Sequence, residues 1–273
     1  MISTMAADRR PHWTRWVALA LAALVIGAYI GLTPPGLLTK ADWVGAAVCH
    51  RIPSHSFSFA GRPLPLCARC TGTFLGALTA LLGQAVFLRR RGTRFPPPVI
   101  TVILVSFILL MGIDGLNSYV DLMRGRPLFY EPRNELRLIT GALNGLALGV
   151  LLWPMVNFTL WRDPQPEPVI RNGRDLGLLL LMEAGMVALV LTGWPALLYP
   201  LALASALGVI SMLTLTMTVI VVITVGRENQ YGNWRDAMTP LLAGLVLAFL
   251  LIGLIDLFRY GLTGTITGVP GLE

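Results

Sequence analysis

Seven long apolar stretches divide this chain, and they constrain its fold more than any other feature. A helix needs about 20 predominantly apolar residues to cross the hydrocarbon layer of a bilayer. The stretches that approach this length are residues 16–33, 71–88, 97–113, 138–160, 176–193, 199–225 and 238–258. We therefore predict an all-α, polytopic membrane protein with about seven transmembrane helices, or six if the two stretches around Gly193-Trp194-Pro195 form one kinked segment.

The composition agrees with a lipid environment. Charged residues make up 13% of the 273 residues and hydrophobic residues 55%, whereas a soluble domain usually has about 25% charged residues. The net charge of +7 could suggest a nucleic-acid partner, but the arginines are spread over short segments between apolar stretches and do not gather on one tail. We expect the lipid bilayer as a partner and no nucleic acid.

The basic residues also predict the topology. Residues 89–94 form a short, arginine-rich connection between two apolar stretches, which is typical of a cytoplasmic loop. Arg9 and Arg10 precede the first stretch, which is too long for the apolar part of a signal peptide. Counting spans from residues 89–94, we expect a multi-pass protein of the cell membrane with its N-terminus in the cytoplasm and its cysteine-bearing segment outside.

The polar features are unevenly distributed along the chain. Residues 1–160 form a membrane domain with motif-rich outer segments, and residues 161–175 form a Pro-rich loop that we expect in the cytoplasm. Residues 176–273 are nearly free of charge within their apolar stretches, apart from Glu183 and Asp256. We expect the chemistry to lie in the first of these three parts.

All three cysteines lie in the first outer segment, as Cys49-His50-Arg51 and Cys67-Ala68-Arg69-Cys70. A short helix is expected from Thr39 to Cys49, and residues 56–66 read as a hairpin or tight loop that would return the chain beside it. A structural zinc site requires four ligands such as thiolates and imidazoles. We predict that Cys49, Cys67 and Cys70 bind zinc or another transition metal and that His50 is the fourth ligand, with His55 or a carboxylate as alternatives.

Two other interpretations of the cysteines stay open. Cys67 and Cys70 precede an apolar helix, and a helix N-terminus with Arg69 nearby would favour thiolate and thus thiol–disulfide exchange. Alternatively, Cys49 forms a structural disulfide with one of the pair, as occurs in oxidising compartments. The spacing of the residues does not choose among metal, redox and structural roles.

Two polar stripes are expected on the outer ends of the third and fourth stretches. Their spacing places each stripe on one helical face, and charged side chains at such depth require partners, for example Asp114 with Arg137 or Asp121 with Arg133. A functional alternative is a pocket for an anion such as a lipid phosphate, because arginine donates bidentately to such groups. The candidate polar or anion-binding residues are Arg51, Arg69, Asp114, Asn117, Arg133, Asn134, Arg137, Thr140 and Asn144.

Three motifs resemble those of a known family. Cys49-His50-Arg51-x-Pro53, Pro65-x-Cys67-Ala68-Arg69-Cys70-Thr71-Gly72 and Asn134-x-x-Arg137-x-x-Thr140-Gly141 are similar to the pattern of the uncharacterised prokaryotic membrane proteins grouped as domain of unknown function 2085. The resemblance covers residues 45–150 and implies a multi-span membrane protein. It implies no established activity.

The sequence therefore predicts a membrane protein with an outer cysteine, histidine and arginine site that binds a metal. The chain contains no nucleotide-binding glycine loop, no H-E-x-x-H motif and no haem-attachment motif. The alternatives are a membrane thiol–disulfide redox protein, a protein that handles or transports anionic lipid, and an accessory subunit of a larger membrane complex. The residues do not decide whether the protein is an enzyme.

Overall fold

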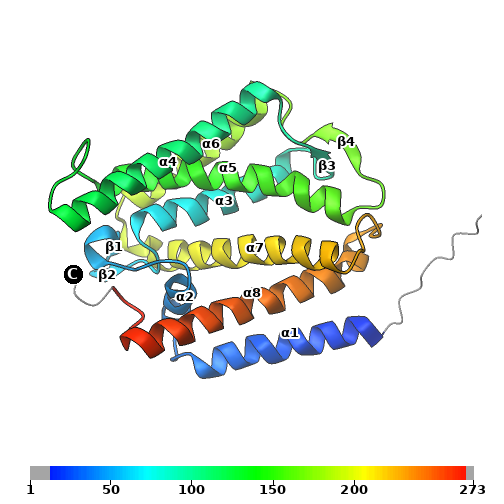
Figure 1. Ribbon diagram of the computed structural model, residues 1–273, viewed down its shortest axis with the longest axis horizontal. Helices are drawn as coiled ribbons and strands as arrows, with labels where there is room; N and C mark the ends of the chain where they lie inside the picture. The colour runs from blue at the N-terminus through cyan, green and yellow to red at the C-terminus, as the bar shows by residue number, and fades with distance from the viewer. Residues whose placement is uncertain (1–12, 269–273) are drawn as a thin grey trace, which may run out of the picture.

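The computed structural model describes residues 13–268 as a bundle of long helices that run side by side (Figure 1). The helices are α1 (Trp13–Leu32), α2 (Leu37–Ala46), α3 (Ala68–Phe87), α4 (Pro98–Arg124), α5 (Asn134–Leu160), α6 (Gly173–Leu191), α7 (Leu198–Thr224) and α8 (Trp234–Thr263). The short elements are η1 (Pro53–His55), β1 (Ser58–Phe59), β2 (Arg62–Pro63), β3 (Gly92–Arg94), β4 (Gln165–Pro168) and η2 (Pro195–Leu197). Each of the seven predicted stretches corresponds to one long helix.

Six helical segments of the described chain are long and apolar enough to cross a membrane: α1, α3, α4, α5, η2 with α7, and α8. α6 is not among them, because Arg174, Asp175 and Glu183 interrupt its 19 residues. The predicted class, a polytopic helical membrane protein, is confirmed. The fifth and sixth stretches form two separate helices, α6 and α7, which are joined through Gly193 in the left-handed conformation with φ of 63°.

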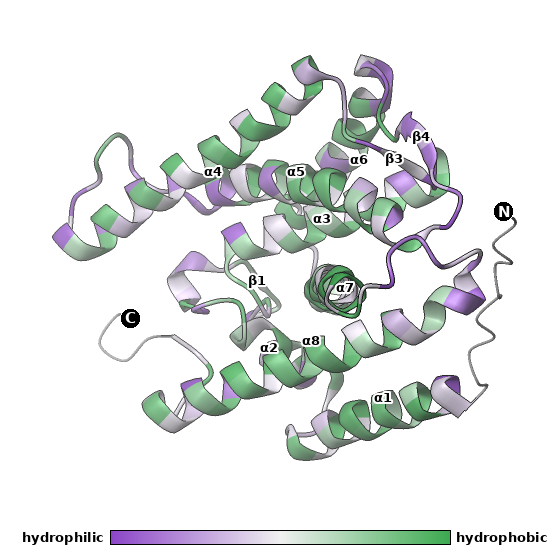
Figure 2. Ribbon diagram, turned by 45° about the vertical axis from the view of Figure 1, so that its right-hand side comes forward, coloured by the Kyte–Doolittle hydropathy of each residue, from purple (hydrophilic) through white to green (hydrophobic). Residues whose placement is uncertain are grey.

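Apolar side chains cover the outside of the bundle. In Figure 2 the ribbons of α1, α4 and α8 are largely green along their length. Many large apolar side chains on α1 and α4, such as Leu24, Val102 and Leu109, are exposed. Apolar residues on every face of a helix are expected where its surroundings are lipid and other helices.

The contact between α3 and α5 forms the centre of the bundle. An added Cβ at Gly72 would overlap the carbonyl oxygen of Leu138, and one at Gly145 would overlap that of Thr73. Gly72 and Gly76 on α3, and Gly141 and Gly145 on α5, have the four-residue spacing by which small residues let membrane helices approach closely. The two backbones are therefore in direct contact, which fixes the start of α3 relative to the start of α5.

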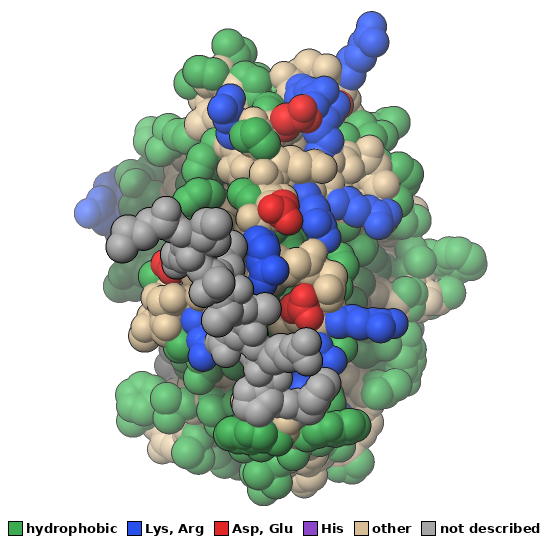
Figure 3. Space-filling model, turned by 90° about the vertical axis from the view of Figure 1, so that its right-hand side faces the viewer, with side chains coloured by type: hydrophobic (Ala, Val, Ile, Leu, Met, Phe, Trp, Pro, Cys, Tyr) green, Lys and Arg blue, Asp and Glu red, His purple; other side chains and the backbone are tan. Residues whose placement is uncertain are grey.

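The connecting segments gather at the two ends of the bundle. At one end, which we call the arginine end, β3 pairs in parallel with β4, and Trp161 bridges to Tyr231. Figure 3 shows this end, where many Arg side chains are exposed with a few acidic ones between them. All three loops that were predicted to be cytoplasmic, residues 89–94, 161–175 and 226–237, meet there.

The opposite end, which we call the cysteine end, holds α2, the β1–β2 hairpin and the connection between α4 and α5 (Figure 1). The segments predicted to share one side of the membrane thus lie together. Which end faces the cytoplasm stays a prediction, and Arg9 and Arg10 lie outside the described residues. Core residues from before and after the Pro-rich loop pack together, for example Leu75 and Leu138 with Val190 and Leu201, while the three-part division of the chain stays a prediction.

The α3–α5 contact can be tested with two glycine substitutions. Gly145→Ala should lower the free energy of unfolding by about 1–3 kcal/mol, because the added methyl group would push the two helices apart. Gly185→Ala on α6 is the matched control: nothing lies within 4 Å of the added Cβ, so removing a helical glycine there should be neutral or stabilising by up to about 1 kcal/mol. Unfolding in detergent, followed by circular dichroism, measures both. Equal stabilities of the two variants would contradict the close contact.

Candidate functional site

The cysteine end brings Cys49 beside the Cys67-x-x-Cys70 pair. α2 ends at Ala46, three residues before Cys49 and earlier than expected from the sequence. The predicted hairpin is confirmed, since β1 and β2 pair in antiparallel fashion and return the chain toward α2. An added Cβ at Gly45 would overlap the carbonyl oxygen of Pro65, so the end of α2 lies directly against the segment that leads to Cys67.

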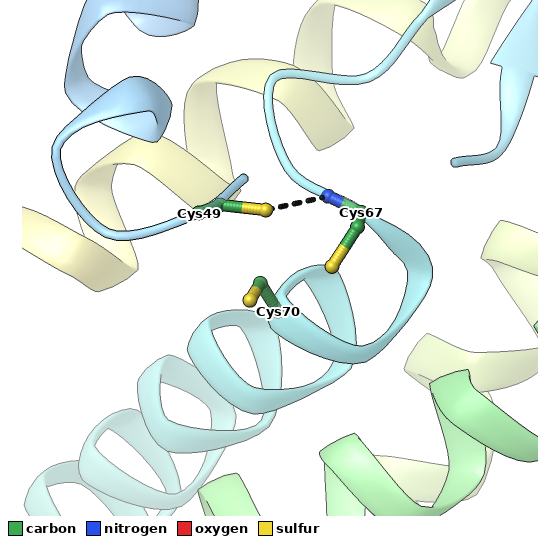
Figure 4. A group of neighbouring side chains, drawn as sticks. All are labelled: Cys49, Cys67 and Cys70. Carbon is green, nitrogen blue, oxygen red and sulfur yellow. Dashed lines mark hydrogen bonds between the residues drawn. The ribbon is translucent and has the colours of Figure 1, made fainter. Parts of the chain in front are cut away.

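The three thiols form one compact group. Their Sγ atoms all lie within 4.8 Å of one another, and none of the three cysteines is in a disulfide. Figure 4 shows Cys67 and Cys70 at the start of α3, with the Cys49 side chain reaching toward them from the preceding loop. Three thiolates on one zinc ion would be about 3.8 Å apart, because Zn–S bonds are about 2.3 Å long and the geometry is tetrahedral. The group is therefore close to the arrangement that a metal ion requires.

Backbone amides point at the sulfur of Cys49. The N–H groups of Cys67 and Arg51 donate to Cys49 Sγ over 3.2 and 3.4 Å. Hydrogen bonds from the thiols of Cys67 and Cys70, with these amides, hold the pKa of Cys49 well below its ordinary value. The pKa of Cys67 is raised, chiefly by its hydrogen bond to Cys49. Hydrogen bonds aimed at the sulfur of Cys49 favour its thiolate form, and amide donors that stabilise a thiolate also suit a metal-bound thiolate.

Apolar side chains and hydrogen bonds from Arg259 hold the thiols in place. Cys49 and Cys67 are buried among residues of α2, α7 and α8 that include Val44, Ala206 and Ile252. Arg259 of α8 donates to the carbonyl oxygens of Ala46, Cys49 and His50, which fixes the loop that carries Cys49.

Arg51 does not join the other candidate arginines. Its guanidinium is buried and pairs with Asp42 over 2.7 Å, and Arg62 pairs with the same carboxylate over 2.9 Å. Burial lowers the pKa of Arg51, which the Asp42 carboxylate partly offsets. Sequence reasoning missed the role of Asp42, because the sequence shows only that it lies near the start of a short helix.

The two neighbouring histidines lie beside the thiols without joining them. Among the described residues, the group of ligand atoms contains the three cysteines and neither histidine nor carboxylate. The rings of His50 and His55 meet edge to face with centroids 5.9 Å apart. Burial, followed by the charge of Arg137, lowers the pKa of His55 to about 4. Coordination by His50 stays a prediction.

A second polar group surrounds Asp114, which is buried. Arg69, in the first turn of α3, forms an ion pair with the Asp114 carboxylate and also donates to its backbone oxygen over 3.1 Å. Arg69 further donates to Ser118 over 2.9 Å, and the Tyr130 hydroxyl donates to Asp114 over 2.8 Å. Burial and the hydrogen bond to Asp114 raise the pKa of Tyr130 to about 12. Tyr130 gave no signal in the sequence, because it lies in a loop outside the helical periodicity.

The partner of Asp114 differs from the expected one. Sequence reasoning paired it with Arg137, but the close contact of α3 with α5 brings Arg69 within reach of α4 instead. Arg137 is 6% exposed and donates to Asn134 over 2.9 Å, with a long contact of 3.5 Å to Ser118. No carboxylate of the described chain lies within 4.0 Å of Arg137.

The pair Asp121–Arg133 is also absent from the ion pairs of residues 13–268. Arg133 is exposed where it precedes the first residue of α5. Arg137 therefore lies buried between its neighbours as a cation that no carboxylate neutralises directly.

Three of the remaining candidates make local hydrogen bonds. Asn117 accepts hydrogen bonds from the amides of Leu128 and Phe129 and donates to the carbonyl of Tyr130, which closes the loop after α4. Asn134 donates to the carbonyl of Ser54. The Thr140 hydroxyl donates to the carbonyl of Leu136 in its own helix. Asn144 is buried one turn further along α5.

Comparisons with known proteins match the part of the chain that carries this site. A family described as "Predicted membrane protein (DUF2085)" matches residues 49–151, which include the three cysteines, Asp114 and Arg137. An uncharacterized protein of Methanothermobacter thermautotrophicus is 36% identical over 105 residues, which cover 38% of this chain and 83% of the relative. An uncharacterized protein of Methanocaldococcus jannaschii is 27% identical over 112 residues, which cover 41% of this chain and 65% of the relative. No solved structure matches.

The buried ion pair of Asp114 can be tested by removing its carboxylate. Asp114→Ala should destabilise the protein by about 3–5 kcal/mol, because it leaves Arg69 largely buried without its counter-charge. Glu167→Ala is the matched control: Glu167 pairs with Arg171, but both side chains are at least 42% exposed, so the cost should be within about 1 kcal/mol. Chemical unfolding followed by tryptophan fluorescence gives both values. A cost for Asp114→Ala no larger than that of the control would contradict a structural role for this pair.

Proposed function

We propose that this chain, which belongs to the DUF2085 family of predicted membrane proteins, binds a transition metal ion of the zinc class through Cys49, Cys67 and Cys70. Both matched relatives are called uncharacterized, so the proposal rests on the side chains of this chain. The observation that carries this proposal is the convergence of three thiol sulfurs within 4.8 Å. Thiolates are soft ligands that favour Zn²⁺ or Cu⁺ over Mg²⁺ or Ca²⁺.

The geometry favours a metal over a redox disulfide. A disulfide would use two of the sulfurs and leave the third buried beside them, whereas a metal ion would use all three. The amides of Cys67 and Arg51 already donate to the sulfur of Cys49, and Arg259 holds the loop that carries it. With three protein thiolates, the fourth position of a tetrahedral ion would take His50, water or a substrate atom.

The metal hypothesis is tested by elemental analysis of protein purified in mild detergent without chelator. We expect about one metal ion per chain, and a loss of at least tenfold in each of Cys49→Ser, Cys67→Ser and Cys70→Ser. Cobalt-loaded protein should show thiolate-to-metal absorption bands that weaken in these variants. His50→Ala should weaken binding if His50 is the fourth ligand, whereas a loss in His55→Ala alone would assign that position to His55.

Two outcomes would exclude a metal. One is wild-type protein that holds no metal and gives no thiolate bands with cobalt. The other is mass-shift alkylation in cells that finds two of the cysteines cycling between thiol and disulfide, which would establish the redox alternative.

Arg137 supports a second candidate function, recognition of an anion. It is a buried guanidinium with no carboxylate within 4.0 Å in the described chain, and His55 beside it is held neutral at physiological pH by its pKa of about 4. A phosphate or carboxylate group, from a lipid headgroup or a free anion, would supply the missing counter-charge. The site would then place an anion near the thiol group.

The anion site is tested with Arg137→Ala and the matched control Arg133→Ala, which removes the exposed arginine that immediately precedes α5. Native mass spectrometry with phosphatidylglycerol probes lipid binding, and the thermal shift caused by inorganic phosphate probes a free anion. We expect at least tenfold weaker binding of one of the two probes in Arg137→Ala and no change in the control. Equal binding in wild type and both variants would contradict the anion site.

A further inference from the structure

Within the described residues, a buried carboxylate without a hydrogen-bond or ion-pair partner lies on α8, one turn before Arg259. Asp256 is 3% exposed, and neither of its carboxylate oxygens has a hydrogen-bond partner. It lines a cavity of about 570 Å³ between α1 and α8, which the end of α2 closes on one side. That volume lies within the range of about 300–1,000 Å³ that is usual for small-molecule sites.

The neighbouring cations do not neutralise Asp256. Arg259, one turn further along α8, donates its guanidinium to the backbone oxygens of Ala46, Cys49, His50 and Gly268. Arg51 pairs with Asp42. No ion pair of the described residues includes Asp256. An ionisable side chain buried within a membrane helix is costly without a partner and is by default a sign of function.

Aromatic rings form part of the same cavity. Trp43 and Tyr260 lie with ring centroids 6.1 Å apart. Tyr29 lines the cavity from α1 and packs edge-on against Phe249 with centroids 5.2 Å apart. The faces of such rings carry partial negative charge and attract ammonium groups. The carboxylate and the rings therefore favour the same kind of ligand, one with a positive charge.

The rest of the cavity is suited to a hydrocarbon chain. Its walls include Val25 and Leu32 of α1 and Leu250 and Leu254 of α8. Asp256 is the one acidic side chain among the described residues that line the cavity. A single carboxylate supplies too few oxygen ligands for a hard metal cation. A neutral lipid tail would fill the apolar part but would leave Asp256 without a partner.

We propose that this cavity binds an amphiphilic amine, with a protonated primary amine at Asp256 and its alkyl chain between α1 and α8. The ammonium group supplies both the charge and the hydrogen-bond donors that the Asp256 oxygens lack. The site is separate from the thiol group and does not depend on the proposed metal. Its ligand class is set by one carboxylate, four aromatic rings and the apolar walls of the cavity.

The test uses 12-bromododecylamine, because bromine quenches tryptophan fluorescence at short range and Trp43 lines the cavity. Full-length protein in a neutral maltoside detergent should show saturable quenching that is lost in Trp43→Phe. The matched probe 12-bromododecanol, which carries no charge, should bind at least tenfold more weakly. Asp256→Asn should weaken binding of the amine at least tenfold.

Two further variants keep the proposal falsifiable. Glu183→Gln is the matched control, because Glu183 is also a buried carboxylate without a hydrogen-bond partner but lines a different cavity, and it should bind the amine as wild type does. Gly253→Leu fills the Asp256 cavity while the carboxylate stays in place, since nothing lies within 4 Å of an added Cβ there, and it should block the amine even if Asp256→Asn fails to fold. Equal quenching by amine and alcohol, or binding unchanged in both Asp256→Asn and Gly253→Leu, would overturn the proposal.

Discussion

The close approach of α3 and α5 is the constraint on which the candidate site depends. Gly72 and Gly76 face Gly141 and Gly145, so the two backbones touch where side chains would normally separate them. An added Cβ at Gly141 would overlap the carbonyl oxygen of Arg69, which means that the first turn of α3 lies against the start of α5. That turn carries Cys70 and Arg69, while Arg137 lies on the first turn of α5. This backbone contact therefore sets how far the thiols and Arg69 lie from Arg137.

The buried charges of the cysteine end differ in how completely they are balanced. Asp114 forms an ion pair with Arg69 and accepts a hydrogen bond from Tyr130, and Arg69 also donates to Ser118. Breaking such an arrangement is costly, although the arrangement itself makes no large net contribution to stability. These residues are explained by their mutual contacts. Arg137 and Asp256 are not, because the described chain supplies no opposite charge to either within 4.0 Å. The contrast separates residues that hold the fold from those that are available to a ligand.

The sequence predicts the helices well because the length of an apolar stretch is a local property that one chain segment carries by itself. The hairpin was also predictable, since Gly61 tolerates the left-handed conformation, with φ of 76°, that its turn requires. The side-chain contacts between different helices were not predictable. The periodicity of α4 shows that Asp114 and Ser118 share a face, but it does not show whether Arg69 or Arg137 lies opposite at that depth. The same limit hid Arg259, which lies more than 200 positions from the carbonyl groups it binds around Cys49.

The burial of the three cysteines bears on whether they react as thiols or bind a metal. A reactive thiol pair needs access for its oxidant or substrate, yet Cys49 and Cys67 are buried among apolar residues and Cys70 alone is half-buried. The same burial protects a metal–thiolate bond from water while leaving one side open at Cys70. Arg51 adopts a left-handed backbone with φ of 54°, a conformation that is uncommon for a residue with a side chain, and its amide donates to the sulfur of Cys49. A strained residue that supplies a donor to a buried sulfur supports the proposed metal site more than it supports a thiol that only fills space.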